Sequence, residues 1–75
     1  MKKNPVLMAL GRNIRDLREQ KRLTQEALAE RSGLDPSYIS GIERAVRNPS
    51  VLSLARLANG LGCTVSDVCR AISKM

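Results

Sequence analysis

The side chains that could do chemistry in this chain are cations, amides and hydroxyls, and the usual catalytic groups are missing. The sequence has no histidine, and its two cysteines, Cys63 and Cys69, lie six positions apart. That spacing fits neither a zinc site nor a C-x-x-C redox motif. There is no phosphate-binding glycine loop and no pair of carboxylates with an obvious cleft. We therefore expect no enzyme activity, no metal and no cofactor.

The charge of the chain favours a polyanionic partner. Thirteen Lys and Arg residues against seven Asp and Glu residues give the 75-residue chain a formal net charge of +6. Nucleic acid is the first candidate for such a chain, and an anionic membrane is the second. No apolar run approaches the roughly 18 residues of a membrane span, and the N-terminal apolar stretch is too short for a signal peptide. We expect a cytoplasmic protein that binds double-stranded DNA and no membrane.

Two short helices joined by a tight turn would position these side chains, and we expect them over residues 25–32 and 36–44. Thr24 and Asp35 are good N-caps, and Gly33 can take the left-handed conformation that ends the first helix. The apolar positions where two crossing helices would touch are Leu28, Ala29, Leu34, Ile39 and Ile42. This is the helix-turn-helix pattern, in which the second helix enters the major groove of DNA.

Three further helices complete an all-α prediction. The first runs from residue 5 or 6 to 21, the next over 51–61 behind the cap Ser50, and the last over 67–73 behind the cap Ser66. Residues 6–75 then form a single domain, and residues 1–5 form a short basic tail. Such a small chain buries only roughly 60% of its unfolded surface, so dimerisation would help to stabilise it.

Four linked motifs carry a family resemblance: T-Q-E-A-L-A at 24–29, S-G-L-D at 32–35, Y-I-S-G-I-E-R at 38–44 and R-N-P-S at 47–50. Together they resemble the Cro and phage-repressor (XRE) family, and within it the small controller proteins of bacterial restriction–modification systems. The resemblance extends from about Leu10 to Val68. It implies a five-helix, lambda-repressor-like DNA-binding domain and a sequence-specific transcriptional regulator.

The resemblance also implies three structural features. Arg18 would pair with Glu43 and tie the first helix to the recognition helix, where the alternative is two independent solvated charges. Gly11, inside the first helix, would be a position of close contact. Ala45 stands where the family usually has a left-handed Gly, so we expect strain in the turn that follows the recognition helix.

We expect base contacts from the outward face of the recognition helix. Its candidate residues are Pro36, Ser37, Ser40, Gly41 and Arg44. Arg44 can donate two hydrogen bonds to guanine, with a phosphate contact as the alternative. Gly41 would allow a close approach to the groove, or is simply a tolerated surface glycine. Because this face has no Gln or Asn to grip adenine, we expect DNA shape and bending to add specificity.

Phosphate contacts are expected from residues that flank the recognition helix. The candidates are Gln25, Tyr38, Arg47 and Asn48. Gln25 heads the first helix of the pair, where backbone N–H groups favour a phosphate, and the family uses a Gln there in the same way. For Tyr38 the alternative is packing of the ring against the helix over 25–32.

A homodimer would place two recognition helices on a two-fold symmetric operator. The resemblance implies a C-terminal dimer interface, with Leu61, Cys63, Ala71 and Ile72 as its candidates and Val65 expected to be buried. The alternative is that these residues only cover the domain's own helices. We expect reduced, half-buried cysteines, with a cross-dimer disulfide or redox switch as the alternative.

Two functions from different classes fit these features. The first is the regulator, with no small-molecule ligand and with RNA polymerase as a further candidate partner. The second is an antitoxin-type interaction module that also binds its own promoter. Antitoxins usually append a toxin-binding segment, and few residues follow the last predicted helix, so we favour the regulator.

Overall fold

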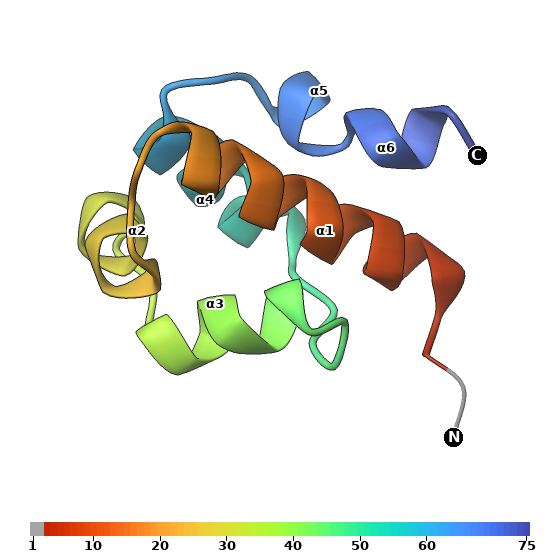
Figure 1. Cartoon of the computed structure of the whole chain (residues 1–75), viewed down its shortest axis with the longest axis horizontal. Helices are drawn as coiled ribbons and strands as arrows, with labels where there is room; N and C mark the ends of the chain where they lie inside the picture. The colour runs from red at the N-terminus through yellow and green to blue at the C-terminus, as the bar shows by residue number, and fades with distance from the viewer. Residues whose placement is uncertain (1–2) are drawn as a thin grey trace.

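The computed structural model describes residues 3–75, and within that range it contains six α-helices and no strand. The helices are α1 (Pro5–Gln20), α2 (Gln25–Ser32), α3 (Pro36–Glu43), α4 (Val51–Leu61), α5 (Val65–Val68) and α6 (Arg70–Ser73). Helix α1 crosses the middle of the view in Figure 1, with α3 below it, α5 and α6 above it and α4 behind it. The predicted all-α fold is confirmed, with one helix more than predicted.

The caps of the helix-turn-helix unit are those the sequence predicts. Thr24 accepts a hydrogen bond from the Ala27 N–H at the start of α2. Gly33 ends α2 with a φ of 71°, in the left-handed region. Asp35 then accepts from the Ser37 N–H and begins α3, which has Pro36 at its first position. Local capping therefore sets the turn between the two helices.

The N-terminal end is more ordered than the predicted tail. Asn4 caps α1 by accepting from the N–H groups of Val6 and Leu7, and the helix begins at Pro5, inside the predicted tail of residues 1–5. The Nζ of Lys3 donates to the carbonyl oxygen of Arg44, 2.6 Å away at the end of α3. Met1 and Lys2, the rest of that tail, lie outside the described residues.

The C-terminal prediction needs correction. Ser66 does not cap a helix over 67–73, because Thr64 begins α5 two residues earlier. Thr64 accepts from the Asp67 N–H, and the Asp67 carboxylate accepts from the Thr64 N–H, a capping box that satisfies two donors at once. The chain then breaks at Cys69 before α6. Val65, predicted to be buried, is 39% exposed because it occupies the first turn of this short helix.

The core is aliphatic, and Tyr38 is the single aromatic residue of the chain. Its buried members are Leu10, Ile14, Leu28, Ala29, Ile39, Ile42, Leu57, Ala58, Leu61 and Val68. Helix α1 packs on α3 and α6, while α2 packs on α3 and α4. The helix-turn-helix unit is therefore fixed from two sides, while Pro36 and Ser37 of α3 and Arg44 at its C-cap remain exposed.

Helices α1 and α3 approach closely at Gly11. A Cβ added there would overlap the carbonyl oxygen of Ile42 and lie 2.8 Å from that of Glu43. The predicted close-contact role of Gly11 is confirmed, since any larger residue would push the recognition helix away from α1. Within the described range, every helix is too short or too polar to span a membrane.

Candidate nucleic-acid interface

The outer face of α3 presents hydroxyl and cationic groups at its two ends. Pro36 and Ser37 are exposed in its first turn, Ser40 is half-buried, and Arg44 is exposed at its C-cap. The Ser37 hydroxyl donates to Asp35 at 2.6 Å, which leaves its lone pairs available as acceptors. The Arg44 Nε donates to the Ser40 hydroxyl at 3.4 Å, a weak bond that a better partner could replace.

Asp35 is held as a charged cap beside this face. Its hydrogen bonds from the Ser37 hydroxyl and the Ser37 N–H lower the pKa of the Asp35 carboxyl below its ordinary value. The predicted structural role of Asp35 is therefore present in the structure. A charged carboxylate at this point also disfavours a phosphate close to the start of α3.

Gly41 does not lie on an open surface, and that prediction is wrong. It is buried, because the side chain of Arg47 folds back from the following loop across it. A Cβ added at Gly41 would lie 2.5 Å from the Cγ of Arg47. The Arg47 guanidinium then lies 6.0 Å from the centre of the Tyr38 ring, at the outer limit of a cation–π contact. In this structure Arg47, rather than the Gly41 backbone, covers that part of α3.

Tyr38 joins α3 to α4. Its half-buried ring packs against the core, and its hydroxyl donates to the Ser53 hydroxyl at 3.1 Å. Ser50, the N-cap of α4, donates to the same Ser53 oxygen at 3.0 Å. The hydroxyl of Tyr38 is thus a donor already in use, and its lone pairs remain free to accept.

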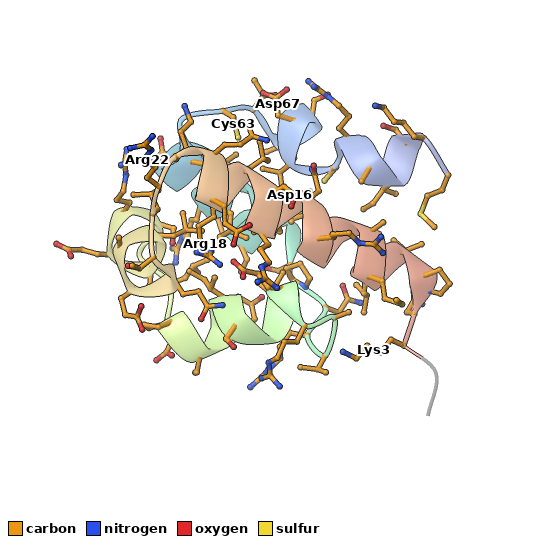
Figure 2. The ribbon with its side chains drawn as sticks, viewed as in Figure 1. Lys3, Asp16, Arg18, Arg22, Cys63 and Asp67 are labelled. Carbon is orange, nitrogen blue, oxygen red and sulfur yellow. The ribbon has the colours of Figure 1, made fainter. Side chains whose placement is uncertain are left out.

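Arg18, Glu43 and Gln25 form one polar cluster that joins α1, α2 and α3. The Arg18 Nε lies 2.7 Å from Glu43 Oε2, and the second Arg18 bond to Glu43 is 3.0 Å long. Both side chains are almost enclosed, at 12% and 4% exposure. Arg18 also donates to the Leu23 carbonyl at 2.8 Å. The ion pair implied by the resemblance is present, and the alternative of two solvated charges does not hold; Figure 2 shows Arg18 reaching from α1 toward α3.

Gln25 is held by the same cluster. Its Nε2 donates to Glu43 Oε1 at 3.0 Å, which fixes the side chain at the first residue of α2. The hydrogen bonds from Arg18 to Glu43 raise the pKa of Arg18 above its ordinary value, so the guanidinium stays charged. The free amide oxygen, one amide hydrogen and the backbone N–H of Gln25 remain for a ligand at the start of α2.

The loop after α3 is strained at Ala45, as expected. Its φ is 63°, in the left-handed region that favours glycine, and the residue is buried. Arg47 and Asn48 follow it and are exposed. This turn sets where the loop leaves α3, and so where these two side chains lie relative to the helix.

The candidate dimer residues divide into two groups. Leu61 is only 1% exposed within the monomer, so its assignment to a dimer interface is wrong. Cys63, Ala71 and Ile72 are half-buried, and both cysteines are unpaired thiols. Burial raises the pKa of the Cys63 thiol and so disfavours its reactive thiolate.

The sequence analysis did not identify two exposed apolar residues on α4 as candidates for an interface. Val51 is 79% exposed and Leu52 is 62% exposed, in the first turn of the helix. The available signal was the helical period, which places Leu52 away from the inward positions Leu54, Leu57 and Leu61.

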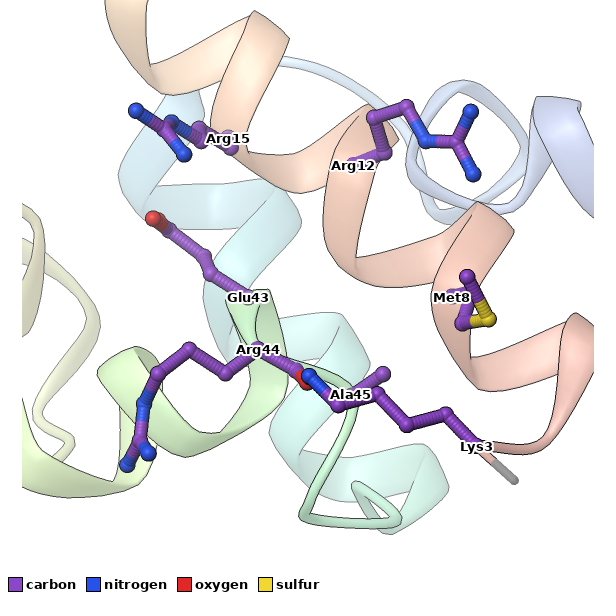
Figure 3. A pocket seen from close by; sticks show the side chains of 7 residues that line it. All are labelled: Lys3, Met8, Arg12, Arg15, Glu43, Arg44 and Ala45. Atoms are coloured by element: carbon purple, nitrogen blue, oxygen red, sulfur yellow. The ribbon is translucent and has the colours of Figure 1, made fainter. Parts of the chain in front are cut away.

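Sequence reasoning also missed a basic hollow. It lies between α1 and the C-terminal end of α3 and has a volume of about 180 Å³ (Figure 3). We call it the α1–α3 hollow, and its lining residues are Lys3, Met8, Arg12, Arg15, Glu43, Arg44 and Ala45. No sequence signal identifies it, because Lys3 and Arg44 are 41 residues apart.

Comparisons with known proteins agree with this architecture. The model of the family described as "Helix-turn-helix" matches residues 14–68. The control protein C.MunI of Mycoplasma sp. is 36% identical over 72 residues, which cover 95% of this chain and 97% of the relative. The crystal structure of the restriction–modification controller protein C.AhdI from Aeromonas hydrophila is 42% identical, with a TM-score of 0.81 over 83% of this chain and 94% of that one.

A solved structure with bound DNA is also similar. C.Esp1396I bound to a 19 base pair DNA duplex is 38% identical, with a TM-score of 0.84 over 95% of this chain and 96% of that one. The family match covers most of the chain, and these relatives match it over nearly their full lengths. This chain is therefore a member of the helix-turn-helix family of transcriptional regulators, and its close relatives are restriction–modification controller proteins.

Proposed function

We propose that this protein acts as a restriction–modification controller in the cytoplasm, binding a two-fold symmetric operator as a homodimer. Helix α3 lies in the major groove of each half-site. The observation that carries this proposal is the cluster of Arg18, Glu43 and Gln25, which fixes α3 against α1 and α2 while its outer face stays exposed. The full-length similarity to controller proteins supports the same function.

Base contacts in this proposal come from the two ends of α3. Arg44 donates to guanine, and Ser37 and Ser40 supply hydroxyl groups that accept or donate. Pro36 offers an apolar contact to a thymine methyl group. Gly41 has no part in base reading while Arg47 covers it.

Phosphate contacts come from both sides of α3. Gln25 stands at the start of α2, where the N–H groups and the helix dipole favour an anion. Arg47 and Asn48 are exposed in the loop beyond α3, and the Tyr38 hydroxyl donates to Ser53. Phosphate oxygens accept hydrogen bonds and do not donate them. A contact from the Tyr38 hydroxyl to a phosphate therefore requires its hydrogen bond to Ser53 to break.

The proposed dimer is consistent with the size of the domain. Recognition helices on adjacent half-sites lie about 34 Å apart, and the domain measures 30 × 23 × 22 Å. Two domains side by side therefore reach both half-sites. We assign the contact to exposed apolar side chains: Val51 and Leu52 on α4 join the half-buried Cys63, Ala71 and Ile72.

A binding titration tests the function. DNA from immediately upstream of the gene is compared with scrambled DNA of equal length across a range of salt concentrations. We expect upstream-specific binding that persists near physiological salt, about 0.15 M. Equal, weak binding to both that collapses steeply with salt would leave only the positive charge at work and would reject the proposal.

A sedimentation experiment tests the dimer. Leu52→Glu places a charge at the start of α4 and Ala71→Glu places one on α6, and Arg31→Glu serves as the control at an exposed position of α2. We expect at least one of the first two variants to be monomeric at concentrations where the wild type is a dimer. A wild-type protein that binds the operator as a monomer would contradict the proposed homodimer.

Replacing the spacer between half-sites tests the contribution of DNA shape. We expect affinity to change with spacer sequence even though no side chain contacts those bases. Equal affinity for all spacers would assign specificity to α3 alone.

A further inference from the structure

Helix α1 faces the recognition helix on one side and the C-terminal helices on the other. Gly11 and Arg18 of α1 contact α3. Asn13 comes two residues after Gly11, which places it roughly 200° around the helix at about 3.6 residues per turn. Figure 1 shows α5 and α6 on the side of α1 opposite to α3. Helix α1 therefore stands between the recognition helix and the candidate dimer residues of α6.

The side-chain amide of Asn13 binds the end of α5. Its Nδ2 donates to the carbonyl oxygen of Asp67 at 2.9 Å and to that of Val68 at 2.6 Å. These are the last two residues of α5, 54 and 55 positions further along the chain. Carbonyl groups at the end of a helix lack partners inside that helix, so a donor from outside satisfies them. Here α1 provides such a donor and is thereby tied to α5.

The two C-terminal helices have little else to hold them in place. Each has only four residues, too few for a helix to be stable by itself. Within the described residues, α6 has no buried member and no side-chain cap at its start. Its Ile72 packs against the core but stays half-buried. The ion pair between Arg70 and Asp67 is partly exposed and contributes little.

The bonds from Asn13 fix a position that apolar packing alone leaves free. Apolar contacts have no preferred direction, whereas a hydrogen bond requires its donor and acceptor to be aligned. The contact of Ile72 with the core therefore allows α6 to slide along α1. The two bonds from Asn13 form only when the end of α5, and with it the start of α6, lies at one place on α1.

That position matters to a protein that binds DNA as a dimer. Two recognition helices reach adjacent half-sites only when they lie about 34 Å apart. The distance depends on where the dimer contact lies relative to α3. Ala71 and Ile72, the candidate contact residues on α6, are connected to α3 through α1.

We propose that Asn13 is a positioning residue for the homodimer. It holds α5 and α6 at the place on α1 where Ala71 and Ile72 meet the partner while both α3 helices meet their half-sites. This rests on the proposed function, because it assumes a homodimer. It gives a role in operator binding to a side chain that acts through α6 and touches no DNA.

Sedimentation of three variants tests the effect on dimerisation. Asn13→Asp keeps the size of the side chain but removes its donor, and Asn13→Leu removes the donor without adding a charge. Gln20→Glu makes the same change from amide to carboxylate at an exposed position of α1. We expect both Asn13 variants to dimerise roughly tenfold more weakly, as for the loss of a hydrogen bond. Gln20→Glu should dimerise like the wild type.

Two DNA duplexes separate positioning from general support of the fold. One carries the full operator and the other a single half-site. We expect the Asn13 variants to lose roughly tenfold in apparent affinity for the full operator, and higher protein concentration should restore binding by mass action. Their affinity for the half-site should match that of Gln20→Glu, because the contacts of Gly11 and Arg18 with α3 are unchanged. Equal losses on both duplexes would overturn the proposal, since Asn13 would then support the whole domain.

Amide hydrogen exchange in the DNA-free protein locates the change. The N–H groups of Cys69 and Ser73 bond to carbonyl groups within the C-terminal helices and should exchange faster in both Asn13 variants. Ile39 and Ile42 in α3 should keep their protection. Asn13 variants that dimerise and bind the full operator like a dimeric wild type overturn this inference alone. A wild type that binds the operator as a monomer rejects the proposed homodimer, and the role of Asn13 with it.

Discussion

Arg18 of α1 and Glu43 of α3 form a two-bond ion pair that is almost enclosed and spans 25 positions of sequence. The pair lies beneath the C-terminal half of the recognition helix and also holds Gln25 at the start of α2. One polar cluster therefore links α1, α2 and α3, beside the apolar contacts of the core.

Removing one member of this pair should destabilise the protein strongly. Arg18→Met leaves the Glu43 carboxylate buried without its partner, and we expect a loss of about 3–5 kcal/mol in the free energy of unfolding. The double variant Arg18→Met/Glu43→Leu leaves no buried charge and should recover most of that loss. Urea unfolding measures both, and a single variant within about 0.5 kcal/mol of the wild type would show that the pair is only a surface contact.

Two glycines should respond differently to the same substitution. Gly11→Ala should cost roughly 2–3 kcal/mol, because its Cβ meets the rigid carbonyl groups of Ile42 and Glu43. Gly41→Ala meets the Cγ of Arg47 at 2.5 Å, and this side chain can change its rotamer, so the cost should be offset by the higher helix propensity of alanine and leave stability nearly unchanged.

Thermal unfolding of the two alanine variants makes this comparison directly. Operator binding gives a second readout for Gly41→Ala, because displacement of Arg47 should alter affinity without a loss of stability. Equal destabilisation by both substitutions would contradict the contacts described for Arg47.

The strained turn offers a stabilising substitution. Ala45 has a φ of 63°, so Ala45→Gly relieves a conformation that costs an L-residue about 1–2 kcal/mol. Glycine also has more conformational freedom in the unfolded chain, which lowers the free energy of unfolding by about 0.4–1 kcal/mol. We expect a net gain of roughly 0.5–1 kcal/mol by urea unfolding, with Gly33→Ala as the reverse control at a φ of 71°. A loss of stability in Ala45→Gly would mean that burial of its methyl group outweighs the strain.

These results separate what the sequence predicts well from what it does not. The caps Thr24, Asp35 and Ser50 were predictable because each acts within three residues of its own position. The Arg18–Glu43 pair was predictable only from the family resemblance, since the two residues are far apart in the chain. The correct predictions therefore came from local hydrogen bonding and from a pairing that the family resemblance implies.

The wrong predictions arise where two nearby residues could both cap a helix, or where a side chain takes a place that no sequence pattern indicates. Ser66 and Thr64 are both possible caps, and the reciprocal bonds of Thr64 with Asp67 favour the earlier start. Leu61 has the composition of an interface residue, but its side chain is used in the core. Gly41 is buried by Arg47, whose path from the loop depends on the strained turn at Ala45 and not on any periodic pattern.

Acid should weaken the start of the recognition helix. Hydrogen bonds from Ser37 lower the pKa of Asp35 below its ordinary value of about 3.8. The stabilisation is therefore fully present above that value and is lost as the pH falls through the lower folded pKa. Asp35→Asn keeps a good cap but does not titrate.

The measurement is the free energy of unfolding of the wild type and Asp35→Asn, compared from neutral to strongly acidic pH. We expect the wild type to lose more stability than the variant as the pH falls below about 3.8. Asp67, whose pKa is lowered by its bonds with Thr64, contributes in the same direction in both proteins. A difference that does not change with pH would contradict a lowered Asp35 pKa.

The most direct test of the central claim is a hydroxyl-radical footprint on the upstream DNA, combined with guanine N7 methylation interference. A homodimer with α3 in the major groove predicts two protected patches on one face of the duplex, with centres about 34 Å apart. It also predicts interference at guanines within each half-site, which Arg44→Gln should relieve. A single patch, or protection without any effect of N7 methylation, would contradict the account.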